Sequence, residues 1–432
     1  MSFIDNSRQR RSAALAALGL GLTAVTVLAG CDSTNTGGGG AGSDVAWGAS
    51  AAEYQAALAD MEPIELIMQS GTASPDHPDA VATLEFIDRI EEYSGGKITI
   101  DITWAYGIVS NVLEFDDALV DGRLDISAFW PQYDPAEYPA TNLLVDATVV
   151  RDPRMYVGFY SSMAAFQEIG LGTPEIVSEW TDKGITPLTI MSPDGPSIIA
   201  CSQPLDSLAD LEGRQIRAGG TVHARELEEL GAIPVSLPYP EVYEALQRGI
   251  LDCSMSAHTI ATSGGHLEVA PYVYHTDTEA LASTPTNIYA GPRFLQLPRA
   301  AQQLIQESAT VLSAYGFDRF FDRVVTESVV IATDGGGGFF AMPQEVDDLL
   351  VTINEGILAD VATTSLFDGD EFVQRVTEVN DAWVAKVIEL GYEDDGPFSA
   401  FPTWYATTPD HEPWRQAVVT DILAELSPVN AL

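Results

Sequence analysis

Strand and helix patterns alternate along two separate stretches of this 432-residue chain. The first stretch contains three apolar strand patterns, "IELIMQS" (64–70), "ITIDITWAYG" (98–107) and "LDISAFW" (124–130). The second contains "QIRAGG" (215–220), "IPVSLP" (233–238) and "ILDCSMSA" (250–257), with helical patterns between them. Because neighbouring parallel strands must be joined by a crossover, such alternation is typical of parallel sheets. The sequence therefore predicts an α/β protein with two doubly-wound lobes.

A long apolar pattern over residues 298–330 reads as one helix or a broken pair, and we expect it to span both lobes. Two open lobes joined by more than one crossing place a ligand in the cleft at the carboxyl ends of their strands. The predicted division of the chain is a signal peptide at 1–30, a lipidated and Gly-rich linker at 31–61, lobe I at 62–184 plus about 281–318, and lobe II at 185–280 plus about 319–432.

The charge of the chain excludes some classes of partner. Its 20 Lys and Arg residues stand against 63 Asp and Glu residues, which gives a formal net charge of −43. Such a surface repels nucleic acid and anionic lipid, so we expect no nucleic-acid partner. The acidic composition indicates a protein from a halophilic or halotolerant source. The alternative is that an ordinary extracellular protein has drifted towards acidic residues.

The N-terminal residues resemble an export signal. Arg8, Arg10 and Arg11 precede the apolar run "AALAALGLGLTAVTVLAG", after which Cys31 follows. A basic segment, a short apolar segment and small residues before a cleavage point describe a secretory signal peptide. The run is too short and glycine-rich for a convincing transmembrane span.

"LAGC" (28–31) also resembles the bacterial lipobox, which predicts that Cys31 carries lipid and begins the mature protein. The alternative is a plain signal peptide with an incidental cysteine. The following "DSTNTGGGGAGSD" is a flexible polar leash that favours the lipid anchor. We expect contact with the membrane through this anchor only.

Two further cysteines, Cys201 and Cys253, would lie in an oxidising compartment. Either a disulfide or a pair of buried thiols fits them.

Known catalytic motifs do not occur in the sequence. There is no G-x-S-x-G, no H-E-x-x-H, no Walker loop and no G-x-G-x-x-G after a strand. The six histidines are scattered without metal-ligand spacing, and the acidic pairs read as solvated faces. We therefore expect no enzyme activity, no cofactor and no metal.

A mid-chain run carries a family resemblance. "LADLEGRQIRAGGTVHARELEELGAIPVSLPYPEVYEALQRGILD" resembles the second lobe of DctP-type substrate-binding subunits of TRAP transporters, whose pattern is D-L-x-G-x-K-x-R, then L-G-A-x-P, then E-x-Y-x-A-L-Q-x-G-x-x-D. "SPDHPDAVATLEFIDRIEEYSGGKITIDITWAYGIVSNVLEFDDALVDGRLDIS" resembles the first lobe, and "LPRAAQQLIQES" fits a family helix. The resemblance covers about 64–330 and implies a two-lobed, type II periplasmic-binding-protein-like fold.

The resemblance also implies site residues. The last position of D-L-x-G-x-K-x-R is the arginine that grips the ligand carboxylate in this family, and it aligns with Arg217, while Arg214 points outward. A guanidinium suits this task because it binds a carboxylate through two bonds and keeps its charge. The alternative for Arg217 is a structural salt bridge within its lobe.

The resemblance indicates further candidate ligand-binding residues, and for each of them packing in an ordinary core is the alternative. They are Tyr239 after the "IPVSLP" strand, Ser256 and His258 near the end of "ILDCSMSA", Trp130, Gln132 and Tyr133 after "LDISAF", and Trp104 and Tyr106 at the end of "ITIDIT". Two departures from the family concern the ligand: Ser197 stands near the place of a second arginine, and "AYGIVSN" replaces G-Q-L-G.

We therefore expect a lipid-anchored extracytoplasmic receptor that binds a small organic acid in its cleft. Its partners would be the TRAP membrane permease subunits, which use an ion gradient. An ABC-type importer receptor is the alternative among binding proteins, and the mid-chain motif argues against it. A lipid-anchored hydrolase is the alternative among enzymes, and it lacks a recognisable nucleophile and base.

Overall fold

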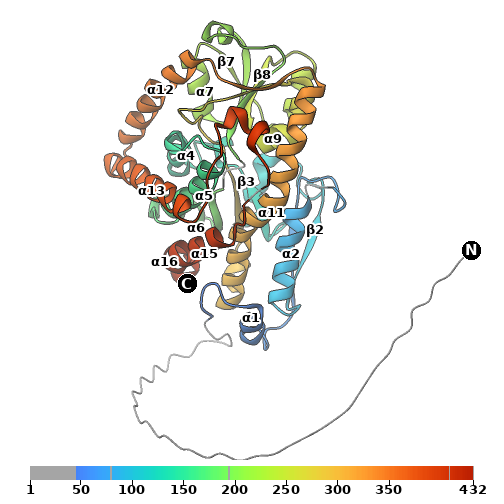
Figure 1. Cartoon of the computed structure of the whole chain (residues 1–432). Coiled ribbons are helices and arrows are strands. Elements are labelled where there is room, and N and C mark those ends of the chain that lie inside the picture. Colours follow the sequence, from blue (N-terminus) through green and yellow to red (C-terminus); the bar gives the residue numbers. More distant parts are fainter. Residues whose placement is uncertain (1–44, 78–79, 193–194, 408, 432) are drawn as a thin grey trace, which may run out of the picture. The chain divides into compact units, whose positions relative to one another are not determined.

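The computed structural model describes residues 45–77, 80–192, 195–407 and 409–431, all of which belong to one compact unit. They contain a five-stranded and a six-stranded sheet, and helices pack around both (Figure 1).

The first sheet has the strand order β2-β1-β3-β10-β4. Its strands are β1 (Ile64–Gln69), β2 (Ile98–Thr103), β3 (Ile126–Phe129), β4 (Thr186–Ser192) and β10 (Thr286–Ala290). β1 pairs in parallel with both β2 and β3, whereas β10 runs antiparallel to both β3 and β4. The reversed strand is therefore the one that returns from the second sheet.

The second sheet has the strand order β11-β9-β5-β8-β6-β7. Its strands are β5 (Ser197–Cys201), β6 (Gln215–Ala218), β7 (Ile233–Ser236), β8 (Cys253–Ala257), β9 (Tyr272–His275) and β11 (Gly338–Ala341). β6 is parallel to β7 and β8, and β5 is antiparallel to β8 and β9. Here too the reversed strand, β5, is the one that arrives from the other sheet.

Within the described residues, the chain passes between the sheets three times, from β4 to β5, from β9 to β10 and through the helix before β11. The first crossing lies later than the predicted lobe boundary at residue 185. β4 pairs with β10, so it belongs to the first sheet and the chain leaves that sheet after Ser192. The apolar run "ITPLTIM" fits a buried strand of either sheet, and only the pairing with β10 decides between them.

The third crossing is the helix α11 (Arg299–Asp334), a single 36-residue helix rather than a broken pair. At 1.5 Å per residue it is about 54 Å long. It packs against α2 (Val81–Tyr93) and β4 of the first sheet, and against α9 (His258–Ser263) and β11 of the second (Figure 1). The predicted two-lobed α/β fold with a long helix shared by both lobes is confirmed.

The remaining helices pack against the sheets and against one another. They include α1 (Ala51–Ala57), α3 (Phe115–Val120), α4 (Pro139–Asp146), α5 (Tyr156–Leu171), α6 (Pro174–Thr181), α7 (Thr221–Glu229), α8 (Val242–Gln247), α10 (His266–Val269), α12 (Gln344–Ala362), α13 (Gly369–Glu389), α14 (Phe401–Trp404), α15 (Glu412–Val418) and α16 (Ala424–Leu426).

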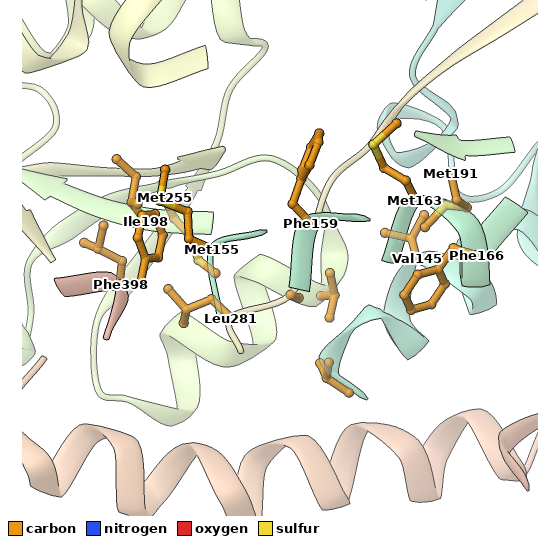
Figure 2. Packing of buried hydrophobic residues seen from close by; sticks show 14 of the residues in the cluster. Val145, Met155, Phe159, Met163, Phe166, Met191, Ile198, Met255, Leu281 and Phe398 are labelled. Atoms are coloured by element: carbon orange, nitrogen blue, oxygen red, sulfur yellow. The ribbon is translucent and has the colours of Figure 1, made fainter. Parts of the chain in front are cut away.

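The largest apolar core extends from α5 into the second sheet. Figure 2 shows Met155, Phe159 and Met163 in the same cluster as Ile198 of β5 and Met255 of β8. All residues of α5 except Glu168 are buried, so this helix is a central element rather than a surface cover.

Cys201 and Cys253 form a disulfide, which decides between the two alternatives that the sequence left open. The two residues face each other across the antiparallel pair of β5 and β8. Cys31 and the predicted signal peptide lie outside the described residues. Within the described part of the chain, no helix combines the length and apolar character needed to cross a membrane.

Candidate ligand-binding site

Arg217 lies on β6, between β7 and β8, and its side chain is buried, with only 3% of the residue exposed. Its Nε donates to the carbonyl of Leu237 at 2.9 Å, and Nη1 donates to the carbonyl of Met255 at 3.1 Å. Nη1 also reaches Ser256 Oγ at 3.4 Å, and Nη2 reaches the hydroxyl of Tyr133 at 3.3 Å. The two backbone carbonyls therefore fix the plane of the guanidinium.

No salt bridge between described residues involves Arg217. Burial lowers the pKa of Arg217, and the Tyr133 hydroxyl opposes this effect. Arg214 is less buried, since it is half-exposed and donates to the carbonyls of Asp210 and Pro204 at the surface. The expected order of burial between the two arginines is therefore found, and the described acids supply no structural counter-ion for Arg217.

One residue that follows a strand of the first sheet, Tyr133, contacts Arg217. Tyr133 follows β3, and its hydroxyl accepts from both Arg217 Nη2 and the backbone N–H of Tyr239 at 3.4 Å. Tyr239 follows β7 in the second sheet, and its hydroxyl lies 2.6 Å from that of Tyr106 at the end of β2. These contacts join the two sheets at the arginine.

Aromatic rings complete this cluster, which we call the Arg217 site: Arg217, Ser256, Tyr106, Trp130, Tyr133 and Tyr239. The ring of Trp130 lies 5.6 Å from that of Tyr239 and 6.4 Å from that of Tyr133, between centroids. Phe115 packs between Trp130 and Tyr106 at 6.1 and 5.1 Å. Trp130 Nε1 donates to Thr286 Oγ1, so the polar edge of the indole is held by the returning strand β10.

The backbone at Tyr106 is strained. Ala105 and Tyr106 have φ angles of 55° and 51°, a region that costs non-glycine residues of order 1–2 kcal/mol each. Gly71 makes room for the ring, because a Cβ there would lie 2.4 Å from the Tyr106 hydroxyl. Strain of this kind concentrates at binding and catalytic sites, which is consistent with a functional placement of Tyr106.

Gln132 lies beside the site, against Gly220 at the start of α7, and donates to the carbonyl of Pro285. Trp104 is half-buried at the end of β2.

Two further predicted site residues, Ser197 and His258, are also not part of the cluster. Ser197 Oγ donates to the carbonyl of Ala282 at 2.6 Å. His258 is fully buried, with Nε2 at 2.8 Å from Ser328 Oγ, and its ring packs among Phe339, Phe398 and Phe401. His258 begins α9 and turns away from the end of β8, so its placement contradicts the expected position near the arginine.

The structure adds residues that the sequence did not indicate. Phe115 supports two aromatic rings of the site, and His223 on α7 accepts from the backbone of Gly219 beside Arg217. Arg151 is 5% exposed, and its Nε has no partner among the described residues. Burial lowers the pKa of Arg151 to about 10. None of these residues falls on a motif, so no signal in one sequence could have singled them out.

No group of three or more metal-ligating His, Cys, Asp or Glu residues occurs within the described ranges. The Arg217 site consists of one cation, hydroxyl groups and aromatic rings. Such a set can orient and neutralise an anionic group, and it contains no nucleophile paired with a base.

Relatives of known sequence resemble part of the chain. The uncharacterized protein YiiZ of Salmonella typhimurium is 27% identical over 219 residues, which are 48% of this chain and 62% of YiiZ. The chain thus spans about three fifths of the length of that relative.

Solved structures share the fold. A marine metagenome TRAP solute-binding protein specific for aromatic acid ligands, in complex with metahydroxyphenylacetate, matches with a TM-score of 0.64 and 21% identity over 74% of this chain and 99% of its own. A TRAP solute-binding protein from Rhodoferax ferrireducens T118, in complex with benzoate, matches with a TM-score of 0.64 and 20% identity over 76% of this chain and 100% of its own. About a quarter of the present chain therefore has no counterpart in these structures.

The model of the family described as bacterial extracellular solute-binding protein, family 7 (DctP), matches residues 69–323. This range contains every member of the Arg217 site and all strands of both sheets except two. β11 lies outside it, and only the last residue of β1, Gln69, lies inside it. The chain therefore belongs to the bacterial extracellular solute-binding protein family 7.

Proposed function

We propose that this protein is the extracytoplasmic receptor of a TRAP transporter and binds a small organic acid through its carboxylate at Arg217. The observation that carries the proposal is a buried arginine without an acidic partner in the described part of a chain that has 63 Asp and Glu residues. An unneutralised buried charge is costly, and an anionic ligand would supply the missing counter-ion.

The contacts of Arg217 suggest how a carboxylate binds. A guanidinium has five N–H groups, and the contacts to Leu237 and Met255 are the short ones at 2.9 and 3.1 Å. The contacts to the hydroxyls of Tyr133 and Ser256 are long, at 3.3 and 3.4 Å. A carboxylate would replace the two long contacts on Nη1 and Nη2, while the hydroxyl groups turn to donate to its oxygens. Because Tyr133 and Ser256 come from different sheets, the ligand would bind to both lobes at once.

The aromatic rings of Tyr106, Trp130 and Tyr239 supply a flat, apolar surrounding for the rest of the ligand. The solved relatives bound to benzoate and metahydroxyphenylacetate support an acid with an aromatic body.

The proposed partners are the membrane subunits of the transporter, which use an ion gradient. The receptor performs no chemistry itself, and the ligand favours the closed arrangement through contacts that only closure provides. We also propose that a lipid on Cys31 anchors the protein outside the cell membrane, as the "LAGC" sequence indicates.

A thermal-shift screen of small organic acids against the mature protein tests the proposal. A ligand at a hundred times its dissociation constant stabilises the folded state by about 2.7 kcal/mol, which is readily measured as a rise in Tm. Benzoate and 3-hydroxybenzoate belong in the screen, with benzamide and benzyl alcohol as neutral matched controls. A rise with an acid but not with its neutral analogue is expected, and equal shifts with acid and amide would contradict carboxylate recognition.

A further inference from the structure

His223 makes two backbone hydrogen bonds through opposite edges of its ring. It lies on α7 and is fully buried. The N–H of Gly219 donates to Nδ1 at 3.3 Å, which leaves the ring proton on Nε2, and Nε2 lies 2.9 Å from the carbonyl of Ala282. Burial lowers the pKa of His223 to about 3, so the ring is neutral and keeps one donor and one acceptor.

The first partner, Gly219, borders the ligand arginine. It follows β6 directly, and a Cβ at this position would lie 2.7 Å from Arg217 Nη1. The backbone that His223 holds is therefore in contact with the guanidinium.

The second partner, Ala282, lies in a crossing between the lobes. Residues 276–285 connect β9 of the second sheet to β10 of the first. Two other side chains also hold Ala282: Glu226 Oε1 accepts from its N–H at 2.9 Å, and Ser197 Oγ donates to its carbonyl. Segments that cross between two lobes change their backbone conformation when the lobes close. Because three side chains hold Ala282, a hinge motion of this segment must either strain these hydrogen bonds or move the side chains that make them.

We propose that His223 is a positioning residue that couples the Arg217 site to the crossing segment at Ala282. A shift of the crossing moves the imidazole, and the imidazole moves Gly219 against the guanidinium, so the arginine is correctly placed only when the crossing is in its closed geometry. For ligand binding, this inference rests on the proposed function.

Two substitutions separate the two bonds. His223→Asn keeps a polar atom near the position of Nδ1 and loses the one at Nε2, whereas His223→Gln does the reverse. Amide hydrogen exchange followed by NMR at Gly219 and at Ser283, whose N–H donates to Thr148 Oγ1, reports each side without any ligand. Coupling predicts that each variant speeds exchange on both sides by about two- to tenfold, the factor that one lost hydrogen bond gives. If each variant affects only the side whose bond it removes, the coupling does not exist.

His258 offers a matched control in the same lobe. It is fully buried on α9, its Nε2 lies 2.8 Å from Ser328 Oγ, and its ring packs among Phe339, Phe398 and Phe401. His258→Gln should leave exchange at Gly219 and Ser283 unchanged at equal global stability. If it speeds both as strongly as the His223 variants do, general loosening explains the result and the coupling is refuted.

A binding measurement completes the test, with the acid that gives the largest shift in the thermal screen as the probe. Coupling predicts a weaker affinity in His223→Asn although the bond to Gly219 is kept. Wild-type affinity in this variant would overturn the inference while leaving the carboxylate site intact. Failure of every acid to bind the wild-type protein would instead refute the proposed function, and the exchange experiment would still decide the coupling.

Discussion

The hydroxyl groups of Tyr106 and Tyr239 lie 2.6 Å apart, although the two residues follow strands of different sheets. Tyr106 reaches this position with a strained backbone, at a φ angle of 51°. Tyr239 in turn donates its N–H to Tyr133, which contacts Arg217. A short chain of contacts therefore runs from the end of β2 to the arginine, and each step of it crosses from one sheet to the other.

This chain predicts the effect of Gly71→Ala. The new Cβ would lie 2.4 Å from the Tyr106 hydroxyl, so the ring must move away from Tyr239. Only a side chain has to shift, so we expect a small change in Tm. Binding of the proposed carboxylate ligand should weaken about tenfold, the value of one good hydrogen bond. Isothermal calorimetry measures the affinity. Gly338→Ala is the control, because its Cβ meets nothing closer than 3.5 Å. Unchanged affinity in Gly71→Ala would show that Tyr106 only fills space.

Much of this arrangement could be predicted from the sequence, because strand ends follow local patterns. The spacing of "DLEGRQIR" places Arg217 on a strand and Arg214 at its entry. Tyr239 follows β7, and Trp130 and Tyr133 follow β3. Each of these strands is predicted by its own apolar pattern, so the position of the residue that follows it is predicted as well. Their role in binding stays a prediction.

Features that depend on distant segments could not be predicted. His258 is surrounded by Phe339, Phe398 and Phe401, which lie far along the chain and give no local signal. The sequence of α5 gives no clear helix signal, because a helix that is apolar on all sides has no 3.6-residue period. The pairing of Cys201 with Cys253 depends on the antiparallel register of β5 and β8, which requires knowledge of the sheet order.

The disulfide should contribute measurably to stability. Cys201 and Cys253 are 52 residues apart, and closing a loop of this size typically stabilises a protein by about 2–4 kcal/mol. We expect a lower Tm when the protein is melted in a strong reductant. The double variant Cys201→Ala/Cys253→Ala should start at the lower Tm and show no response to reductant. A response in the double variant, or none in the wild-type protein, would argue against the bond.

Buried His258 should make stability depend on pH. Burial lowers its pKa to about 3, so below pH 6.5 the unfolded chain binds a proton that the folded protein does not accept. The contribution of His258 is complete above pH 6.5 and is lost progressively as the pH falls from 6.5 to about 3, by up to about 1.4 kcal/mol per pH unit. In His258→Gln, the free energy of unfolding measured by denaturant titration should fall less steeply over this range. Identical slopes in wild type and His258→Gln would contradict the prediction.

A lipid on Cys31 predicts that the protein fractionates with membranes. In Cys31→Ser the thiol that would be acylated is missing, so we expect the protein in the soluble extracytoplasmic fraction. Intact-mass spectrometry of the wild-type protein should show an N-terminal acylated cysteine and loss of residues 1–30. A mature N-terminus at another residue without lipid would refute the anchor and leave the proposed receptor function untouched.

Arg217 provides the sharpest test, and lysine is the informative substitution. Arg217→Ala would leave the buried carbonyls of Leu237 and Met255 without a donor, so its effects on binding and on folding could not be separated. Lysine keeps the positive charge and can still donate to one of these carbonyls, but it lacks the planar fork that binds a carboxylate through two bonds. Loss of one charge-assisted bond, typically about 1.5–3 kcal/mol, predicts an affinity lower by about ten- to over a hundredfold.

Arg214→Lys is the matched control, since Arg214 is a half-exposed arginine of the same lobe that also donates to backbone carbonyls. It should bind the ligand as the wild-type protein does. Calorimetry and a melting curve on both variants separate the outcomes. If Arg217→Lys binds normally, the carboxylate is recognised elsewhere. If instead its Tm falls and the affinity of the folded fraction is unchanged, Arg217 serves the second sheet alone, through the two carbonyls that hold its guanidinium.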